Sequence, residues 1–362
     1  MDATVDFFLG SRSQAGYTSL FSEMTKPPLT SFLMTGPSGR GKANLLSVAE
    51  EYCQKDGFVE RFRCGCHPGH LDGLYFHGSG LSLLSSQEPH TWKPKYPLAY
   101  ETEISVNHCY DTKPLSFYRE RIAALTTAQD DSFGRCGNYL QGTRAFLKDN
   151  FLIALEMTNT EKIAHMVRRI FHQEFAHHKG SRRGIEHRRF LGAVTPNGVT
   201  TCWETVERLC QRIYLVHDEF GCASRILMAA LRAVALEVGE EIFTCYCPLQ
   251  PFEKIDHILF PQASIGFVTE NKLLKPRLTP YRRIHCTRFM NLDKLDEKKE
   301  RLKFNRKAAA DMLAQATGCM RQASDFHRRI CEIYEDAEKK EAFDAVAGEL
   351  LERLDTAGAG SF

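Results

Sequence analysis

The residues best suited to chemistry form a glycine-rich stretch near the start of the chain. Gly36, Gly41 and Lys42 match the G-x-x-x-x-G-K spacing of a phosphate-binding P-loop, and Gly39 adds a permissive position. Glycines let backbone N–H groups converge on phosphate oxygens, and a helix that begins near the lysine adds its positive end. The lysine ammonium would pair with the outer phosphates. The candidate nucleotide-binding residues are Gly36, Pro37, Ser38, Gly39, Arg40, Gly41, Lys42 and Ala43.

The residues around this loop predict the strand–loop–helix context that a P-loop needs. Phe32, Leu33 and Met34 form an apolar run that predicts a strand before the loop. Leu45 and Leu46 begin an apolar pattern with helical spacing after it. The loop therefore lies where it could receive phosphate.

The usual protein ligands for Mg²⁺ are missing from this loop and its neighbouring strand. Ala43 stands where a Ser or Thr hydroxyl normally binds the metal, and the candidate acidic strand end is Ser85. Asp72 and Glu88 are the nearest carboxylates, and Asp72 either approaches the loop or caps a turn. We expect binding of a nucleotide, ATP by default, with weak or absent protein ligation of Mg²⁺. Hydrolysis should be weak or absent, because charge neutralisation by the metal is what phosphoryl transfer mainly needs.

The chain contains an internal repeat. Five segments recur in the same order, which chance would hardly produce. The pairs are Phe8–Gly10 with Phe190–Gly192, Ser31–Thr35 with Arg212–Val216, Phe62–Cys66 with Phe243–Cys247, Leu71–Phe76 with Ile255–Phe260, and Leu81–Leu84 with Ile265–Val268. The sequence therefore predicts a tandem duplication.

Each half predicts an α/β domain of P-loop NTPase type with a parallel sheet, followed by a long helical segment. The loop carrying Leu71-Asp72, or Ile255-Asp256, would separate the second and third strands of each half. Helices are expected over 115–178 and 294–354, the second as an antiparallel hairpin, and they could form a lid, a partner surface or a cover for the sheet. The predicted domains are residues 1–180 and 181–362.

The second half has lost the residues of a phosphate site. The segment from His217 to Arg225 lies over the first loop in the repeat and lacks both frame glycines and the lysine. Asp218 and Glu219 stand where phosphate would approach, and like charge makes its binding costly. Ser224 falls at the hydroxyl position. We expect this second loop to be inactive.

Two other groups of residues have alternative interpretations. Cys64, Cys66, His67 and His70 could form a metal site, or Cys64 and Cys66 could join Cys245 and Cys247, although buried free thiols are the commoner outcome. The basic segment 162–189 could contact nucleic acid or a nucleotide, or could be a solvated helix end and linker. Aromatic residues are not interleaved with its cations, which makes nucleic acid an unlikely partner.

Composition indicates an ordinary globular protein. The 362 residues are 43% hydrophobic and 25% charged, without an apolar run of about 18 residues that could span a membrane. The N-terminal residues are acidic and predict no export signal, so the 13 cysteines are expected to be reduced thiols in the cytoplasm.

The chain also resembles a little-characterised bacterial family of predicted ATPases built from two P-loop halves in tandem. The likeness covers nearly the whole chain and rests on Phe8–Gly10, Phe190–Gly198, Gly36–Lys42, Cys64, Leu71–Gly73 and Pro89-His90. It implies nucleotide binding at Gly36, Gly39, Gly41 and Lys42. It does not extend to the metal positions, because the family has a hydroxyl residue at Ala43 and an acidic strand end at Ser85, and the second loop departs almost completely.

Two functions follow from these observations. The first is an ATP-binding, ATPase-like protein whose N-terminal loop still holds phosphate. The alternative is a catalytically inactive pseudo-NTPase that acts as an interaction or regulatory protein, with a protein partner bound through the helical tails.

Overall fold

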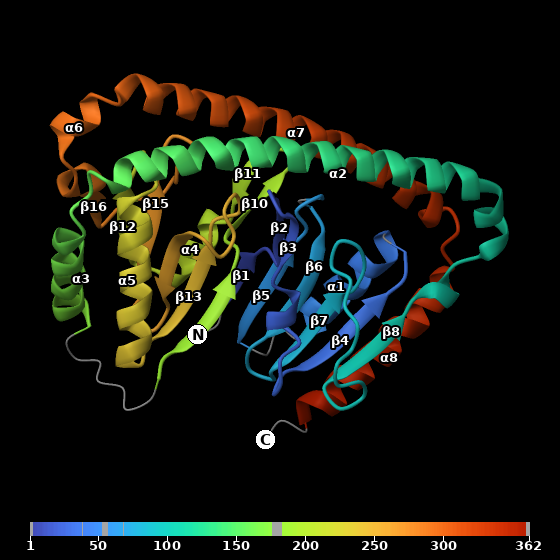
Figure 1. Ribbon diagram of the computed structural model, residues 1–362. Coiled ribbons are helices and arrows are strands. Elements are labelled where there is room, and N and C mark those ends of the chain that lie inside the picture. Colours follow the sequence, from blue (N-terminus) through green and yellow to red (C-terminus); the bar gives the residue numbers. More distant parts are fainter. Residues whose placement is uncertain (1–2, 38, 53–56, 68, 176–182, 360–362) are drawn as a thin grey trace. The chain divides into compact units, whose positions relative to one another are not determined.

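The computed structural model describes residues 3–37, 39–52, 57–67, 69–175 and 183–359 (Figure 1). The chain divides into two compact units. Unit 1 comprises Met1–Ser11, Ser19–Arg135 and Gly318–Phe362, and unit 2 comprises Arg12–Thr18 and Cys136–Thr317. Each unit is built on one six-stranded sheet.

The sheet of unit 1 is mostly parallel. Its order is β1 (Ala3–Phe7), β5 (Phe58–Arg63), β6 (Leu71–Phe76), β7 (Leu81–Ser85), β4 (Thr30–Thr35) and β8 (Glu101–Ser105). Strand β6 is antiparallel to β5 and β7, and the other three pairs are parallel. Strand β4 lies inside the sheet, between β7 and the edge strand β8, and its apolar residues are those expected of an interior strand covered on both faces.

The sheet of unit 2 repeats this arrangement strand for strand. Its order is β9 (Ile185–Arg189), β13 (Glu241–Tyr246), β14 (Ile255–Phe260), β15 (Ile265–Glu270), β12 (Arg212–His217) and β16 (Arg282–His285). Here β14 is the strand that runs antiparallel to both neighbours. Two short hairpins also correspond, β2 (Gly10–Ser13) with β3 (Gly16–Ser19) and β10 (Gly192–Thr195) with β11 (Gly198–Thr201). The shared order and direction are those expected of a tandemly duplicated α/β domain.

The prediction of a parallel sheet is therefore correct only in part. Leu71-Asp72 and Ile255-Asp256 were expected in loops, but they begin strands β6 and β14. The connection from β6 to β7 spans only residues 77–80, with Gly80 at φ +67°. A connection this short can join only antiparallel strands, since a parallel crossover needs a dozen residues or more.

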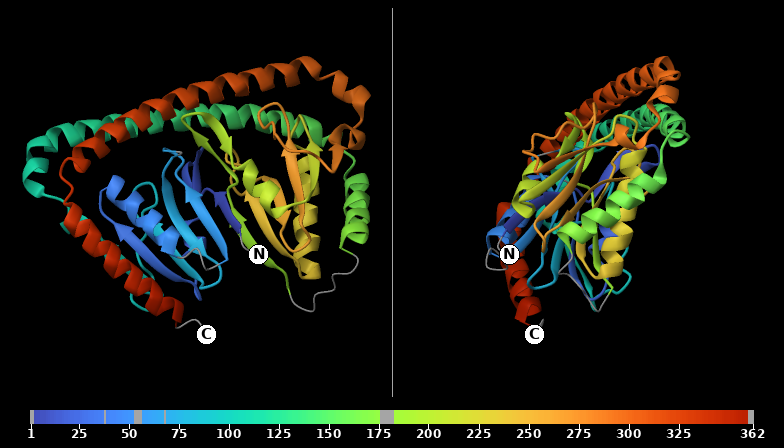
Figure 2. Two further views of the ribbon diagram at one scale, coloured as in Figure 1. Left: turned by 180° about the vertical axis from the view of Figure 1, so that it is seen from behind. Right: turned by 90° about the vertical axis from the view of Figure 1, so that its left-hand side faces the viewer.

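The helices follow the predicted helical segments. They are α1 (Arg40–Tyr52), α2 (Thr112–Leu155), α3 (Thr160–Glu174), α4 (Trp203–Leu209), α5 (Ala223–Val238), α6 (Leu292–Asp296), α7 (Lys299–Glu335) and α8 (Lys340–Ala359), with 3-10 turns η1 (Phe21–Glu23), η3 (Asn107–Cys109) and η4 (Cys286–Phe289). The expected antiparallel hairpin over 294–354 is wrong, because α8 turns away from α7 and packs on α1 and η3 (Figures 1 and 2). Its apolar side chains Phe343, Val346 and Leu350 join the core of unit 1 with Leu45 and Leu46 of α1.

The long helices α2 and α7 each pass from one unit to the other. Helix α2 starts after β8 in unit 1, and its continuation α3 packs on α5 in unit 2. Helix α7 starts in unit 2, and α8 belongs to unit 1. The compact units therefore do not coincide with the predicted domains 1–180 and 181–362. Helix α3 of the first sequence half packs in the core of unit 2, and α8 of the second half packs in the core of unit 1.

Candidate functional site

The predicted phosphate loop lies between β4 and α1 in unit 1. Gly36 has φ +130°, a conformation that favours glycine, and a Cβ there would lie 2.7 Å from Val106 Cγ2. Pro37 and Gly39 complete the described part of the loop, and Ser38 lies outside the described residues. Arg40, Gly41, Lys42 and Ala43 form the first turn of α1. The strand–glycine loop–helix context is therefore present.

Lys42 is directed back toward this loop. Its Nζ donates to the backbone oxygen of Gly36 at 2.9 Å and also to the side-chain oxygen of Gln87. The side chain is buried, and burial lowers the pKa of Lys42 to about 7, although the charge of Asp72 raises it in part. The lysine is thus a cation whose charge depends on pH in the neutral range.

This pKa predicts a pH-dependent affinity for ATP. Below about pH 7 the ammonium is charged and attracts phosphate, and above it the neutral amine accumulates. We expect the association constant for ATP to fall by up to about tenfold per pH unit above 7. Calorimetric titration from pH 7 to about pH 9 would measure this. Lys42→Arg, whose side chain stays charged, should give a flat profile, and an equally flat wild-type profile would contradict the prediction.

A carboxylate from the end of the chain lies at the N-terminal end of α1. The Gly41 N–H donates to Glu338 Oε1 at 3.0 Å, and Arg40 pairs with Glu335 at 3.4 Å. Phe343 lies against Gly41 so closely that a Cβ on Gly41 would be 2.2 Å from its ring. Burial raises the pKa of Glu338, and the Gly41 N–H opposes this. The Glu338 carboxylate therefore lies at the N-terminal end of α1, where helices favour negative charge.

The residues at and near the predicted metal positions lie in and after strands β6 and β7. Ser85 ends β7, and Asp72 lies in β6, where its Oδ2 is 3.1 Å from His90 Nε2. The charge of Asp72 acts on Lys42, so this carboxylate is near the loop lysine as one interpretation required. Glu88 is exposed.

The candidate histidines His67 and His70 lie in a group of imidazole rings in unit 1. The His67 ring centroid lies 5.5 Å from that of His70 and 4.6 Å from that of His327. Burial lowers the pKa of His67 and of His327 to about 4, which keeps both neutral near pH 7. Within the described ranges, no three His, Cys, Asp or Glu side chains are arranged to hold a metal ion.

The basic segment 162–189 forms α3 and β9 where the structure describes it. His187 pairs with Glu241 at 2.8 Å, and Arg188 pairs with Glu186 at 3.4 Å. Residues 176–182 lie outside the described part, including Lys179 and Arg182. Both side chains thus have partners within unit 2.

The second loop is filled by its own carboxylate. Asp218, which is buried, accepts hydrogen bonds from the backbone N–H groups of Phe220, Gly221 and Ser224 at 3.0, 3.0 and 2.8 Å. Two of these donors lie in the loop before α5 and the third in its first turn, so Asp218 occupies the N–H groups at which such loops hold anions. Ser224 is buried at the hydroxyl position, and its Oγ has no partner in the described structure.

Removing the Asp218 carboxylate should destabilise the second half. Asp218→Ala leaves three N–H groups without their acceptor, and we expect a loss of about 1–2 kcal/mol in the free energy of unfolding. Urea unfolding would measure the change. Asp218→Asn should cost less, because an amide oxygen can still accept from two of the three. Equal losses in both variants would indicate that the charge, rather than the hydrogen bonds, stabilises the loop.

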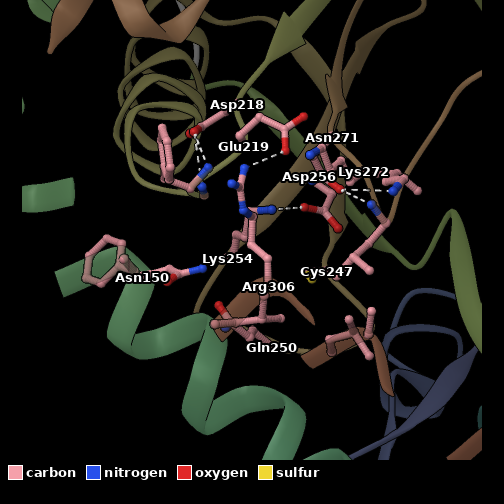
Figure 3. Close-up of a pocket in the computed structure, with 18 of the residues that line it drawn as sticks. Asn150, Asp218, Glu219, Cys247, Gln250, Lys254, Asp256, Asn271, Lys272 and Arg306 are labelled. Atoms are coloured by element: carbon pink, nitrogen blue, oxygen red, sulfur yellow. Dashed lines mark hydrogen bonds and ion pairs between the residues drawn. The ribbon is translucent and has the colours of Figure 1, made fainter. Parts of the chain in front are cut away.

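A pocket in unit 2 was not expected from the sequence. It has a volume of about 390 Å³ and lies beside the second loop (Figure 3). Its polar lining includes Asn150 of α2, Arg225 of α5, Lys254 before β14, Asp256 of β14 and Arg306 of α7. The repeat could have pointed to two of these residues, because it aligns Asp256 with Asp72 and places Arg225 at the end of the second loop. Asn150, Lys254 and Arg306 come from segments without a shared motif.

No described helix has the length and hydrophobicity to cross a bilayer. Searches against protein-family models, curated proteins and solved structures found no match.

Proposed function

We propose that this protein binds a nucleotide through the phosphate loop of unit 1, with ATP as the default ligand, and that Glu338 competes with the phosphates. The observation that carries the proposal is the hydrogen bond from Gly41 N–H to Glu338 Oε1, because this N–H group already donates to an anionic oxygen. Gly36, Gly39 and Gly41 would shape the loop around phosphate. Lys42 would pair with the outer phosphates in place of its bond to the Gly36 carbonyl.

Hydrolysis would be weak or absent under this proposal. Ala43 offers no hydroxyl to Mg²⁺, and Ser85 offers no carboxylate. Mg²⁺ would therefore be held mainly by phosphate and water, and Asp72, whose charge acts on Lys42, would be a candidate for its outer shell. The protein would work in the cytoplasm as a nucleotide-responsive, P-loop ATPase-like protein.

Calorimetric titration with ATP, ADP and GTP, with and without Mg²⁺, tests the proposal. We expect weak to moderate binding that depends little on Mg²⁺ and is lost in Lys42→Ala. Loss of binding in that variant would assign it to the Gly36–Lys42 loop. Undiminished binding there would overturn the assignment.

The alternative, a pseudo-NTPase with an interaction role, is favoured by a separate observation. In each unit a carboxylate of that same unit already accepts a hydrogen bond from the first turn of the helix that follows the loop. Glu338 accepts from Gly41 of α1, and Asp218 accepts from Ser224 of α5. Exposed aromatic residues on the long helices would suit a protein partner: Phe117 of α2 is 86% exposed and Phe304 of α7 is 64% exposed. Absence of nucleotide binding, even after removal of Glu338, would support this function.

A further inference from the structure

The pocket of unit 2 lies where open α/β sheets commonly bind ligands. Part of its wall is formed by residues 218–221 and 271–274, which follow the carboxyl ends of the parallel strands β12 and β15. Helices α2 and α7 supply the opposite side chains. A volume of about 390 Å³ suits a small organic molecule.

Two buried hydrogen-bond donors of this pocket have no acceptor. Asn150 is only 1% exposed; its Oδ1 accepts from Asn305 at 3.0 Å, but its Nδ2 has no partner within the described residues. Arg225 donates from Nη2 to Gln250, and its guanidinium lies 4.3 Å from the Phe151 ring centroid, yet its Nε also lacks a partner there. Buried donors are nearly always satisfied, so this pair indicates that a ligand supplies acceptor oxygens.

The charges around the pocket favour an anion. Its three carboxylates are all engaged: Asp218 by backbone N–H groups, Asp256 by Lys254 at 2.6 Å, and Glu219 by Arg306 at 3.4 Å (Figure 3). The remaining cations of the lining have no ion pair in the described part of the chain. They are Arg225, Lys272, Lys303 and Lys307. The unneutralised charge of the lining is therefore positive.

We propose that this pocket binds a small organic anion. Asn150 and Arg225 receive its acidic group, and the apolar side chains of the lining contact its organic part. The site is distinct from a P-loop, because Asp218 fills the backbone cradle of the second loop. The inference goes beyond the proposed function and does not depend on nucleotide binding in unit 1.

Matched probes test this on the full chain by calorimetry. Phenyl phosphate and benzoate carry the two kinds of acidic group on one apolar body, inorganic phosphate is an acidic group alone, and phenol lacks a full charge near pH 7. We expect phenyl phosphate or benzoate to bind more tightly than both inorganic phosphate and phenol. Whichever of these two aryl anions binds more tightly identifies the kind of acidic group that the pocket prefers. The same binding in Lys42→Ala would separate this site from the unit 1 loop. Failure of both aryl anions to bind, or equal binding of phenol, would overturn the proposal.

Variants locate the binding. Asn150→Leu and Arg225→Gln should each weaken binding of the better probe about tenfold, and Lys307→Gln at the exposed rim about twofold. Lys294→Gln removes an exposed cation outside the pocket lining and is the control for charge. If Asn150→Leu does not fold, the Arg225 and Lys307 variants still decide. Affinities equal to that of Lys294→Gln in these variants would contradict the assignment.

Discussion

Replacing Glu338 by glutamine is expected to raise the affinity of the unit 1 loop for ATP about tenfold. The carboxylate accepts from the Gly41 N–H, so phosphate must displace it before it reaches that donor. A charge-assisted hydrogen bond contributes about 1.5–3 kcal/mol, and a competing contact of about 1.4 kcal/mol lowers the apparent affinity tenfold. Removing the charge also removes repulsion between a carboxylate and phosphate. Calorimetric titration of wild type and variant measures the ratio.

Glu332→Gln is the matched control for this experiment. Glu332 lies near the C-terminal end of α7, and Glu338 follows in the connection between α7 and α8. Glu332→Gln makes the same change in net charge, but Glu332 pairs with Arg328 and not with a loop N–H group. Its affinity for ATP should equal that of the wild type. A Glu338→Gln protein that binds ATP no better than Glu332→Gln would show that the carboxylate does not compete with phosphate.

The local elements of the site could be predicted from the sequence. Phe32, Leu33 and Met34 lie in a strand, and Leu45 and Leu46 pack from a helix, because periodic apolar residues determine such elements over short spans. The loop glycines and Lys42 lie between them as their spacing indicated. Whether the loop binds nucleotide stays a prediction.

The contacts that close the site could not be predicted in the same way. Glu338 is separated from Gly41 by 297 positions, and it meets the loop only because α7 carries the chain back to unit 1. Asn150 and Arg306 likewise enter one pocket from two long helices whose destination the sequence pattern does not encode. Strand β6 was missed for a related reason, since an Asp-Gly pair inside it indicates a turn when read alone.

Gly41→Ala is expected to destabilise unit 1 by about 2–3 kcal/mol through a clash with α8. The new Cβ would lie 2.2 Å from Phe343 Cζ, and the buried ring must move or carry α8 away from α1. The cost should vanish in a Phe343→Ala background, where alanine fits and improves helix propensity by up to about 1 kcal/mol. Urea unfolding of the two single variants and the double variant gives the coupling energy.

Gly348→Ala provides the control for this cycle. Gly348 lies within α8, and a Cβ there would meet no atom within 4 Å, so the same substitution should stabilise the helix slightly. If Gly41→Ala costs as much without the Phe343 ring as with it, the loop itself, and not the docking of α8, would require glycine at this position. If the cost disappears, the absence of a side chain at Gly41 serves the contact with Phe343 of α8.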